Sequence, residues 1–362
     1  MRLVTIFGTR PEIIRLSLII KRLDLFCEQI LVHTGQNYDE QLSDVFFREM
    51  DLRSADHYLG VRGESFGEQV GQIIARTADL LVRSRPDGCL ILGDTNSGLA
   101  AIAAARLRIP VYHLEAGNRC YDDRVPEEIN RRIIDHCSNV LMPYTHRSKE
   151  NLLREGVERE RIFVVGNPIY EVLLAHEAQI GSSDVLARLG VRSRGYLAAT
   201  LHRAENVDDP DRLRDLFEGI CRAGQEHSVP IVVSLHPHTA DRARHFGIDL
   251  EGRGLIVVDP LGFWDFVALE RQALCVISDS GTVQEECCIF RVPSVTIRDT
   301  TERPETIECG SAILSGADPE RIAKAVCIAL QSECDWTPPR EYLEKNVSST
   351  VAKIVMGYRI SA

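Results

Sequence analysis

Short apolar runs alternate with stretches of helical character along the chain. The run Cys89-Leu90-Ile91-Leu92 is apolar at every position, as in a strand buried on both faces of a parallel sheet. In the first half the predicted strands are residues 3–7, 29–33, 88–92, 111–115 and 139–142, and the predicted helices are 12–25, 39–50, 66–83, 97–106 and 127–137. This alternation predicts right-handed crossovers and a doubly wound α/β layer.

The alternation pauses near Gly166-Asn167-Pro168 and then resumes. Pro168 and Gly181-Ser182-Ser183 predict a hinge region. The second series has predicted strands at 196–200, 231–235, 255–258, 275–278 and 295–297, its clearest helix at 211–226, and a last helix at about 340–358. We therefore expect an α/β protein with two Rossmann-like domains that face each other across a cleft.

Composition narrows the class of protein. A chain of 362 residues is long for one core, and 44% hydrophobic with 26% charged residues is typical of a globular protein. We expect no membrane span and no secretion signal. The eleven cysteines show no CxxC spacing and the eleven histidines no HxxxH pair, so we expect reduced thiols, no metal and a cytoplasmic protein. The net charge of −11 argues against a nucleic-acid partner.

Two similar phrases, Gly8-Thr9-Arg10-Pro11-Glu12 and Thr301-Glu302-Arg303-Pro304-Glu305, each follow an apolar run. Each proline fits the first position of a helix, which places Arg10 and Arg303 at the edge where open α/β sheets bind ligands. One arginine in each half predicts an anion bound by both. The alternative is a pair of helix starts with arginines that point into solvent.

Three acidic residues belong to the same expected edge of the first domain. Asp94 follows the strand 88–92, Glu115 closes the strand 111–115, and Glu127 opens a helix. Each has a structural alternative: Asp94 as a helix cap, Glu127 as a first-turn acid or as the i,i+4 partner of Arg131. Three acids at one edge favour general acid–base chemistry over these alternatives.

The second half offers groups that suit a nucleotide. His202 lies in Thr200–Asn206 after a strand, and Ser280-Gly281 at a predicted helix start gives backbone N–H groups close access to an anion. Glu286, further along that helix, suits two vicinal ribose hydroxyls. The alternative is a capped helix with surface glutamates. No GxGxxG or GxxxxGK[ST] phrase is present, which argues against dinucleotide chemistry and ATP hydrolysis.

Together these phrases resemble the non-hydrolysing UDP-N-acetylglucosamine 2-epimerases over essentially the whole chain. The matching stretches are GTRPE (8–12), GDT (93–95), EAG (115–117), PEEINR (126–131), GNP (166–168), HR-x-EN (202–206), DSG-x-x-QEE (279–286) and TERPE (301–305). The resemblance implies the two-domain glycosyltransferase-B fold, in which the C-terminal helix crosses back to the first domain. The N-terminal domain would comprise residues 1–167 plus 340–362 and carry the catalytic acids, and a UDP-binding domain would comprise residues 168–339.

The resemblance also implies a reaction, the reversible C2 epimerisation of UDP-N-acetylglucosamine to UDP-N-acetylmannosamine. UDP leaves by anti elimination, a 2-acetamidoglucal stays bound, and UDP adds back after a proton reaches the opposite face of C2. The implied catalytic residues are Asp94, Glu115, Glu127 and His202, and the implied substrate-binding residues are Arg10, Arg15, Arg131, Ser280, Gly281, Glu286 and Arg303. No cofactor or metal is implied; a homodimer is.

Several positions depart from the commonest family pattern. Arg15 stands where lysine is usual, Thr282 replaces a second glycine after Gly281, and the phrases 236–239 and 35–39 also differ. Arg15 and the phrase 35–39 lie near the place where many bacterial members bind a second, activating UDP-N-acetylglucosamine. The phrase 35–39 and the start Arg-Pro-Glu-Ile-Ile-Arg resemble a subgroup that acts on 6-deoxy sugars such as UDP-2-acetamido-2,6-dideoxy-L-talose.

Three other functions remain open. A glycosyltransferase of the same fold would bind the same nucleotide, although such enzymes usually need only one base. A hydrolysing epimerase would share the elimination step and release N-acetylmannosamine and UDP. A catalytically inactive sugar-nucleotide-binding protein fits least well, because Asp94, Glu115, Glu127 and His202 are all present.

Overall fold

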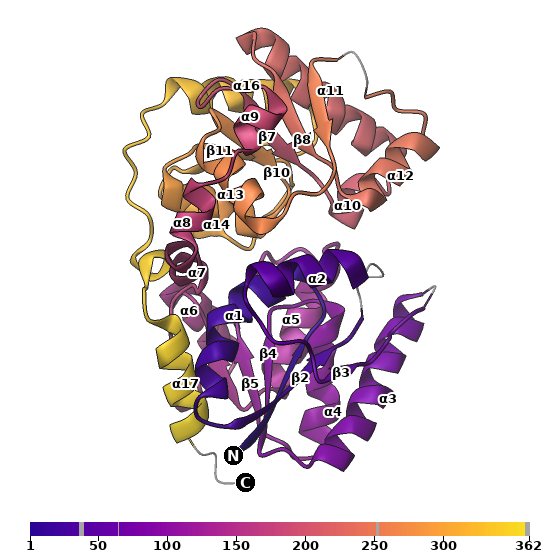
Figure 1. The fold of residues 1–362 in the computed structure, drawn as a ribbon, viewed down its shortest axis with the longest axis vertical. Helices are drawn as coiled ribbons and strands as arrows, with labels where there is room; N and C mark the ends of the chain where they lie inside the picture. The colour runs from indigo at the N-terminus through magenta and orange to yellow at the C-terminus, as the bar shows by residue number, and fades with distance from the viewer. Residues whose placement is uncertain (36–39, 64, 251–252, 359–362) are drawn as a thin grey trace. The chain divides into compact units, whose positions relative to one another are not determined.

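The computed structural model describes residues 1–35, 40–63, 65–250 and 253–358, with the backbone alone for residues 40–44 (Figure 1). The chain divides into two compact units. The first comprises Met1–Leu174 and Arg340–Ala362, and the second comprises Ala175–Pro339. The helix α7, Ile169–Ala175, belongs to the first unit up to Leu174, and its Glu171 accepts hydrogen bonds from the N–H and hydroxyl of Ser348.

The first unit contains a parallel six-stranded sheet in the order β3-β2-β1-β4-β5-β6. Its central strands are fully buried, as their unbroken apolar runs require. The strands are β1 Arg2–Phe7, β2 Glu28–His33, β3 His57–Tyr58, β4 Gly88–Leu92, β5 Val111–Leu114 and β6 Val140–Met142. The helices, including three of 3₁₀ type marked η, are α1 Arg10–Asp24, α2 Glu40–Glu49, α3 Phe66–Ser84, η1 Asn96–Leu99, α4 Ala100–Arg106, α5 Pro126–Cys137, α6 His146–Arg154, η2 Arg159–Arg161, η3 Arg340–Leu343 and α17 Val347–Gly357.

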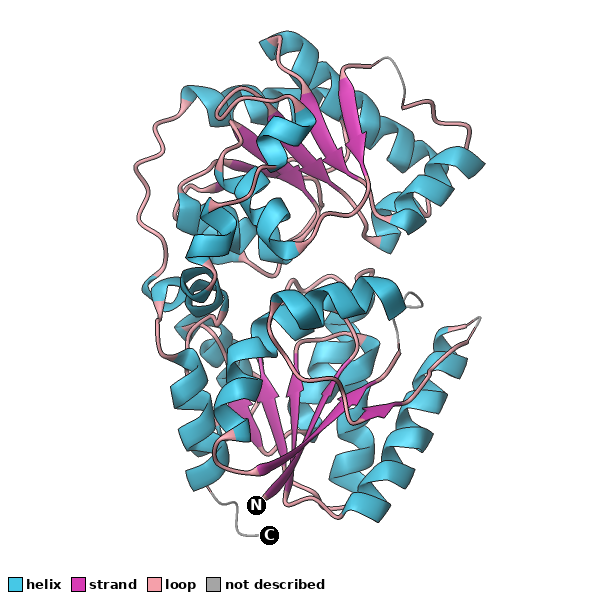
Figure 2. Cartoon of the chain, viewed as in Figure 1, coloured by secondary structure: helices cyan, strands magenta, loops and turns pink. Residues whose placement is uncertain are grey.

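The second unit repeats this topology in the order β12-β11-β10-β7-β8-β9. Its strands are β7 Leu197–Thr200, β8 Ile231–Ser234, β9 Leu255–Val258, β10 Cys275–Ser278, β11 Ser294–Thr296 and β12 Ala312–Leu314. Its helices are α8 Glu177–Gly181, α9 Val185–Leu189, α10 Ala204–Val207, α11 Pro210–His227, α12 Pro237–His245, α13 Phe263–Arg271, α14 Gly281–Phe290, α15 Pro304–Glu308 and α16 Pro319–Gln331. Helices cover both faces of each sheet (Figure 2). Both sheets therefore have the Rossmann strand order, which confirms the predicted fold class.

The C-terminal segment returns to the first unit, as expected, but it is not one helix. The short helix η3 is followed by a break, and α17 then packs against α1. The break comes where Gly166, at φ 88, lies against Glu344, and the Asn167 N–H donates to the Glu341 carbonyl at 2.8 Å. The C-terminal segment thus contacts Gly166 and Asn167, where the first series of strands ends, before α17 begins.

Two edge strands, β3 and β12, were not predicted. β3 has two residues, both exposed, which are too few for a hydrophobic pattern to be visible. β12 has three residues, of which two are only partly buried. All eleven cysteines are free thiols. Within the described ranges, no helix has both the length and the apolar character that a bilayer crossing requires.

Candidate active site

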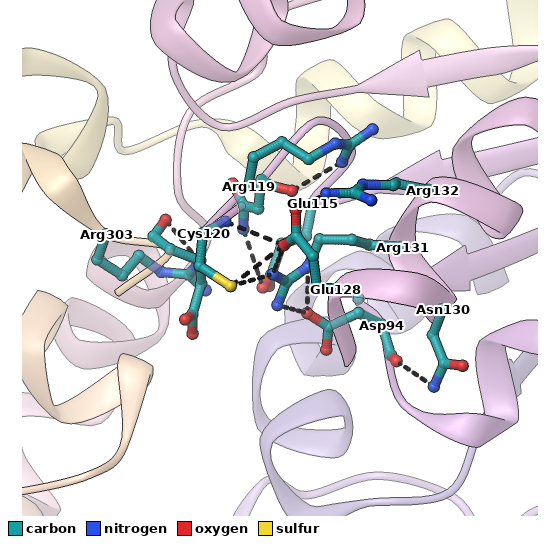
Figure 3. A network of polar contacts seen from close by, with 12 residues as sticks. Asp94, Glu115, Arg119, Cys120, Glu128, Asn130, Arg131, Arg132 and Arg303 are labelled. Carbon is teal, nitrogen blue, oxygen red and sulfur yellow. Dashed lines mark hydrogen bonds and ion pairs between the residues drawn. The ribbon is translucent and has the colours of Figure 1, made fainter. Parts of the chain in front are cut away.

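Asp94 lies just past the end of β4, and α5 supplies its partner. Arg131 donates to Asp94 Oδ2 from Nε at 3.0 Å and from Nη2 at 2.5 Å (Figure 3). The Asn130 side chain also donates to the Asp94 carbonyl at 3.0 Å. Arg131 is 1% exposed and the Asp94 side chain 20% exposed, so the carboxylate is held from the protein side and still meets solvent.

Glu115 lies at the end of the neighbouring strand β5 and forms a buried ion pair with Arg15 of α1. Asn118 donates to the same carboxylate at 3.3 Å, and the Arg15 guanidinium lies 5.7 Å from the centre of the Tyr144 ring. Glu115 has φ 70, in the left-handed region. A non-glycine residue there stores strain on the order of 1–3 kcal/mol, a feature that clusters at functional sites.

The third predicted acid, Glu127, is half-buried in the first turn of α5. Its neighbour Glu128 is fully buried and, three residues before Arg131, accepts a hydrogen bond from the Arg131 guanidinium. Glu127, four residues before Arg131, was the predicted partner of this arginine, and Glu128 was not predicted as one. The doubled glutamate in Pro126–Arg131 was the signal for the second acid, because i,i+3 and i,i+4 neighbours share a helix face.

A buried layer behind Asp94 was not predicted from the sequence. His113 bonds Asp135 through Nδ1 at 2.8 Å and the Gly93 carbonyl through Nε2 at 2.9 Å. Arg119 pairs with the same aspartate at 2.8 Å. Although burial raises the pKa of Asp135, His113 and Arg119 outweigh it and hold that pKa below its usual value. The layer therefore fixes the turn that carries Asp94.

The phrase 8–12 forms the turn from β1 into α1. Glu12 folds back and accepts hydrogen bonds from the N–H groups of Gly8 at 2.6 Å and Thr9 at 2.9 Å, and from the Thr95 hydroxyl at 2.5 Å. Arg10 lies over the Phe46 ring at 5.5 Å, and burial lowers the pKa of its guanidinium. The glutamate thus links the Arg10 turn to the Asp94 turn.

The stability of the fold should depend on pH through Glu12. Burial raises the pKa of Glu12 from 4.5 to about 7, more than its hydrogen bonds lower it. Between pH 4.5 and pH 7 the folded state therefore binds a proton that the unfolded state has lost. The stabilisation from this protonation of Glu12 is complete below pH 4.5 and is lost as the pH rises through 7. Relative to Glu12→Gln, the wild type should lose about 3 kcal/mol of unfolding free energy over that range.

Urea titrations at pH 5 and pH 8 measure this difference. Glu150→Gln, which changes an exposed glutamate of α6, is the control and should show no such slope. Parallel pH profiles for the wild type and Glu12→Gln would contradict the assignment.

In the second unit, Asp279 at the end of β10 organises the loop that carries His202. Its buried carboxylate accepts hydrogen bonds from the N–H groups of His202 and Arg203 and from Asn206 Nδ2, each at 3.0 Å. The His202 side chain is 40% exposed, with Nδ1 3.4 Å from Asp279. Asp279 was not predicted as a site residue, although it opens the phrase 279–286.

The helix α14 begins at the predicted anion site. Ser280 is its N-cap residue, and a Cβ at Gly281 would lie 2.7 Å from Glu302 Oε1, so a side chain there would displace the Glu302 carboxylate. Arg303 is buried and donates from Nε to Glu285 of the same helix. The turn 301–305 is therefore fastened to α14, which contradicts the alternative of an arginine in solvent.

Glu286 is also buried, so the alternative of a surface glutamate is wrong. Its carboxyl group lies near that of Glu270 on α13, which is fully buried. Burial, and then the charge of Glu286, raise the pKa of Glu270 well above its usual value. Glu286 and Glu270 therefore form a buried pair of acidic side chains on α14 and α13.

The positions that depart from the family pattern are partly described. His236 is the N-cap residue of α12, Thr239 donates to the Leu201 carbonyl at 2.8 Å, and Thr282 lies in the first turn of α14. Residues 36–39 of the phrase 35–39 lie outside the described residues. In the part of the chain that the structure describes, no three His, Cys, Asp or Glu side chains are grouped to hold a metal ion.

Comparison with known proteins gives a consistent result. The family model for UDP-N-acetylglucosamine 2-epimerase matches residues 22–356. The chain is 40% identical to the UDP-N-acetylglucosamine 2-epimerase of Methanocaldococcus jannaschii, over 94% of this chain and 95% of that protein. It is 37% identical to the UDP-2,3-diacetamido-2,3-dideoxy-D-glucuronate 2-epimerase of Pseudomonas aeruginosa, over 91% and 92%.

Among solved structures, the M. jannaschii UDP-GlcNAc 2-epimerase in complex with UDP-GlcNAc and UDP is 38% identical. It superposes with a TM-score of 0.94 over 98% of this chain and 99% of that one. The match extends over both units and confirms the family resemblance that the sequence motifs predicted. The chain belongs to the UDP-N-acetylglucosamine 2-epimerase family.

Proposed function

We propose that the protein reversibly inverts C2 of UDP-N-acetylglucosamine to give UDP-N-acetylmannosamine. The observation that carries the proposal is the pair of carboxylates Asp94 and Glu115, which end adjacent strands of one sheet and are each held by a buried arginine. Glu127, at the start of α5, is the third acid of this set. Family membership, and a relative whose structure contains UDP-GlcNAc and UDP, support the same reaction.

The chemistry is within reach of carboxylates. A C2 proton of a resting sugar is too weak an acid for them, but leading cleavage of the C1–O bond develops positive charge at C1 and acidifies that proton. UDP departs, a 2-acetamidoglucal remains, and the proton returned to C2 arrives on the opposite face as UDP adds back. Inversion thus needs acid–base groups on both faces of C2, which Asp94, Glu115 and Glu127 would supply.

The nucleotide needs a different set of groups. Arg10 and Arg303, with His202, would offset the negative charge that grows on the departing diphosphate, and Arg15 and Arg131 are the other proposed substrate-binding arginines. The N–H groups at Ser280 and Gly281 begin α14 and suit a phosphate, and Glu286 suits the ribose hydroxyls. Elimination and addition are redox-neutral, so the reaction balances without a cofactor. The proposal extends to a cytoplasmic protein that forms a homodimer, and light scattering of the purified protein tests the dimer.

Incubation with UDP-N-acetylglucosamine in D2O, followed by NMR, tests the reaction. Deuterium at C2 together with UDP-N-acetylmannosamine supports the proposal. Free N-acetylmannosamine with UDP would instead identify a hydrolysing epimerase. An unchanged substrate would overturn the proposal for this sugar.

Two other UDP-sugars should be tested in the same assay, the first because this chain is similar to a relative that is named for it. The P. aeruginosa relative, 37% identical, is named for a UDP-2,3-diacetamido-2,3-dideoxy-D-glucuronate substrate. The same inversion at C2 applies to that compound and to UDP-2-acetamido-2,6-dideoxy-L-talose. Turnover of either one in preference to UDP-N-acetylglucosamine would keep the reaction and change the substrate.

His202→Ala should weaken both nucleotide binding and turnover. Asp279 accepts a hydrogen bond from the backbone N–H of residue 202, and an alanine there keeps that N–H. The substitution therefore removes the imidazole and leaves the loop in place. We expect the Kd for UDP to rise about tenfold, as for a hydrogen bond to a charged group, and kcat to fall about a hundredfold. Calorimetry with UDP and the NMR assay measure the two effects, with His245→Ala on the exposed end of α12 as the control. An unchanged kcat would exclude His202 from the reaction.

A further inference from the structure

Glu128 receives an unusual number of hydrogen bonds for one side chain. Its Oε2 accepts from the Cys120 N–H at 2.9 Å and from Arg131 Nη1 at 2.5 Å (Figure 3). Its Oε1 accepts from the Tyr121 N–H at 3.1 Å and from Arg132 Nη2 at 3.0 Å. The Cys120 thiol also lies 3.3 Å from Oε2, and the carboxylate is fully buried. So many donors define both the position and the orientation of this carboxylate.

The charge state of Glu128 follows from these contacts. Burial raises the pKa of its carboxyl, but the Cys120 N–H and the Arg131 guanidinium outweigh burial and leave that pKa below its usual value. Glu128 is therefore an anion at neutral pH. The guanidinium of Arg131 then lies between two carboxylates, with Nη1 on Glu128 and the Nε–Nη2 edge on Asp94.

We propose that Glu128 is a positioning residue that acts through Arg131 to orient Asp94 for proton transfer. An arginine has a long, flexible side chain, and a single carboxylate partner leaves its guanidinium plane free to tilt. Contact with Glu128 at one end fixes that plane, so that the other edge meets Asp94 in one geometry. Glu128 also offsets part of the Arg131 charge, which would otherwise oppose the arrival of a proton on Asp94. This role rests on the proposed function, in which Asp94 exchanges a proton with the sugar.

A purely structural role for Glu128 makes different predictions. As a staple between α5 and the loop at Cys120 and Tyr121, the glutamate would affect folding without any connection to Arg131. Loss of the staple would lower the melting temperature, and its effect on kcat would add to the effect of an Arg131 substitution. A positioning role predicts that the two effects on kcat overlap, because both act through one guanidinium.

The kinetic test is a double-mutant cycle of Glu128→Gln and Arg131→Lys. Glu128→Gln should lower kcat about fiftyfold, while KM changes less than threefold. In the Arg131→Lys background the same change should lower kcat less than threefold. Arg132→Gln is the matched control, because it removes the other guanidinium from Glu128 without contact to Asp94, and its kcat should stay within threefold of the wild type. Additive effects, or a wild-type kcat in Glu128→Gln, would overturn the proposal.

A second measurement does not depend on turnover. NMR of arginine Nε–H groups should show one slowly exchanging signal that is lost in Arg131→Lys, which assigns it to Arg131. Its exchange with solvent should be at least ten times faster in Glu128→Gln and unchanged in Arg132→Gln. Unchanged exchange in Glu128→Gln would refute positioning even if the wild type turned over no UDP-sugar, whereas an inactive wild type with the expected exchange would refute the proposed function alone. Glu128→Asp, which keeps the charge, repeats both tests should the amide variant fold poorly.

Discussion

Asp94→Asn is expected to lower kcat about a thousandfold while UDP binds as before. An asparagine has the size of aspartate but cannot accept the C2 proton, and general acid–base groups contribute roughly 10²–10⁴-fold to catalysis. The amide also removes one carboxylate from the buried Arg131 guanidinium, which keeps its contact with Glu128. The expected Kd for UDP changes less than threefold, since Asp94 acts on the sugar. The NMR assay gives kcat and calorimetry gives the Kd.

The control for Asp94→Asn is Asp79→Asn, which makes the same change at an exposed position of α3. It should retain wild-type kcat. Solvent deuterium adds a sharper criterion, because a variant that has lost one acid–base group should also incorporate deuterium at C2 more slowly. An Asp94→Asn variant with kcat within tenfold of the wild type would remove Asp94 from the proton-transfer step.

Much of the fold could be predicted because parallel strands buried on both faces have a distinctive pattern. β4, which is buried at every position, begins and ends where its apolar run does, since burial sets the boundaries of that run. The edge strand β9 also has the predicted bounds, although it is only partly buried. The tail could not be predicted as η3 and α17, because its break depends on the contact of Glu344 with Gly166, far away in the sequence. Local periodicity contains no information about such a contact.

The site was predictable in outline for a related reason. The carboxyl ends of parallel strands share one edge, so Asp94 and Glu115 were expected near each other. The partner of Arg131 was a harder question, because Glu127 and Glu128 lie four and three residues away and both are helix neighbours of it. The fold makes Glu128 a partner by placing the loop N–H groups of Cys120 and Tyr121 over its carboxylate. The buried pairing of Glu286 with Glu270 similarly depends on how α13 packs against α14.

Glu115→Gln should lose both turnover and stability. As an acid–base group, Glu115 should be worth about a thousandfold in kcat, as for Asp94. Its carboxylate also neutralises Arg15, and both side chains are almost completely buried. Removing one member of a buried ion pair leaves the other charge uncompensated, at about 3–5 kcal/mol. Urea titration should therefore show a loss of about that size, together with the loss of kcat.

Substitutions of Arg15 separate these two effects of the pair. Arg15→Met leaves Glu115 without its guanidinium and should destabilise the first unit as much as Glu115→Gln does. Arg15→Lys keeps the positive charge but loses the planar contact with Tyr144, so it should retain kcat within about tenfold and most of the stability. If Arg15→Lys were as inactive as Glu115→Gln while its stability stayed near that of the wild type, the guanidinium geometry would be essential to catalysis. The pair would then act as one unit in proton transfer, and the assignment of the acid–base role to Glu115 alone would be wrong.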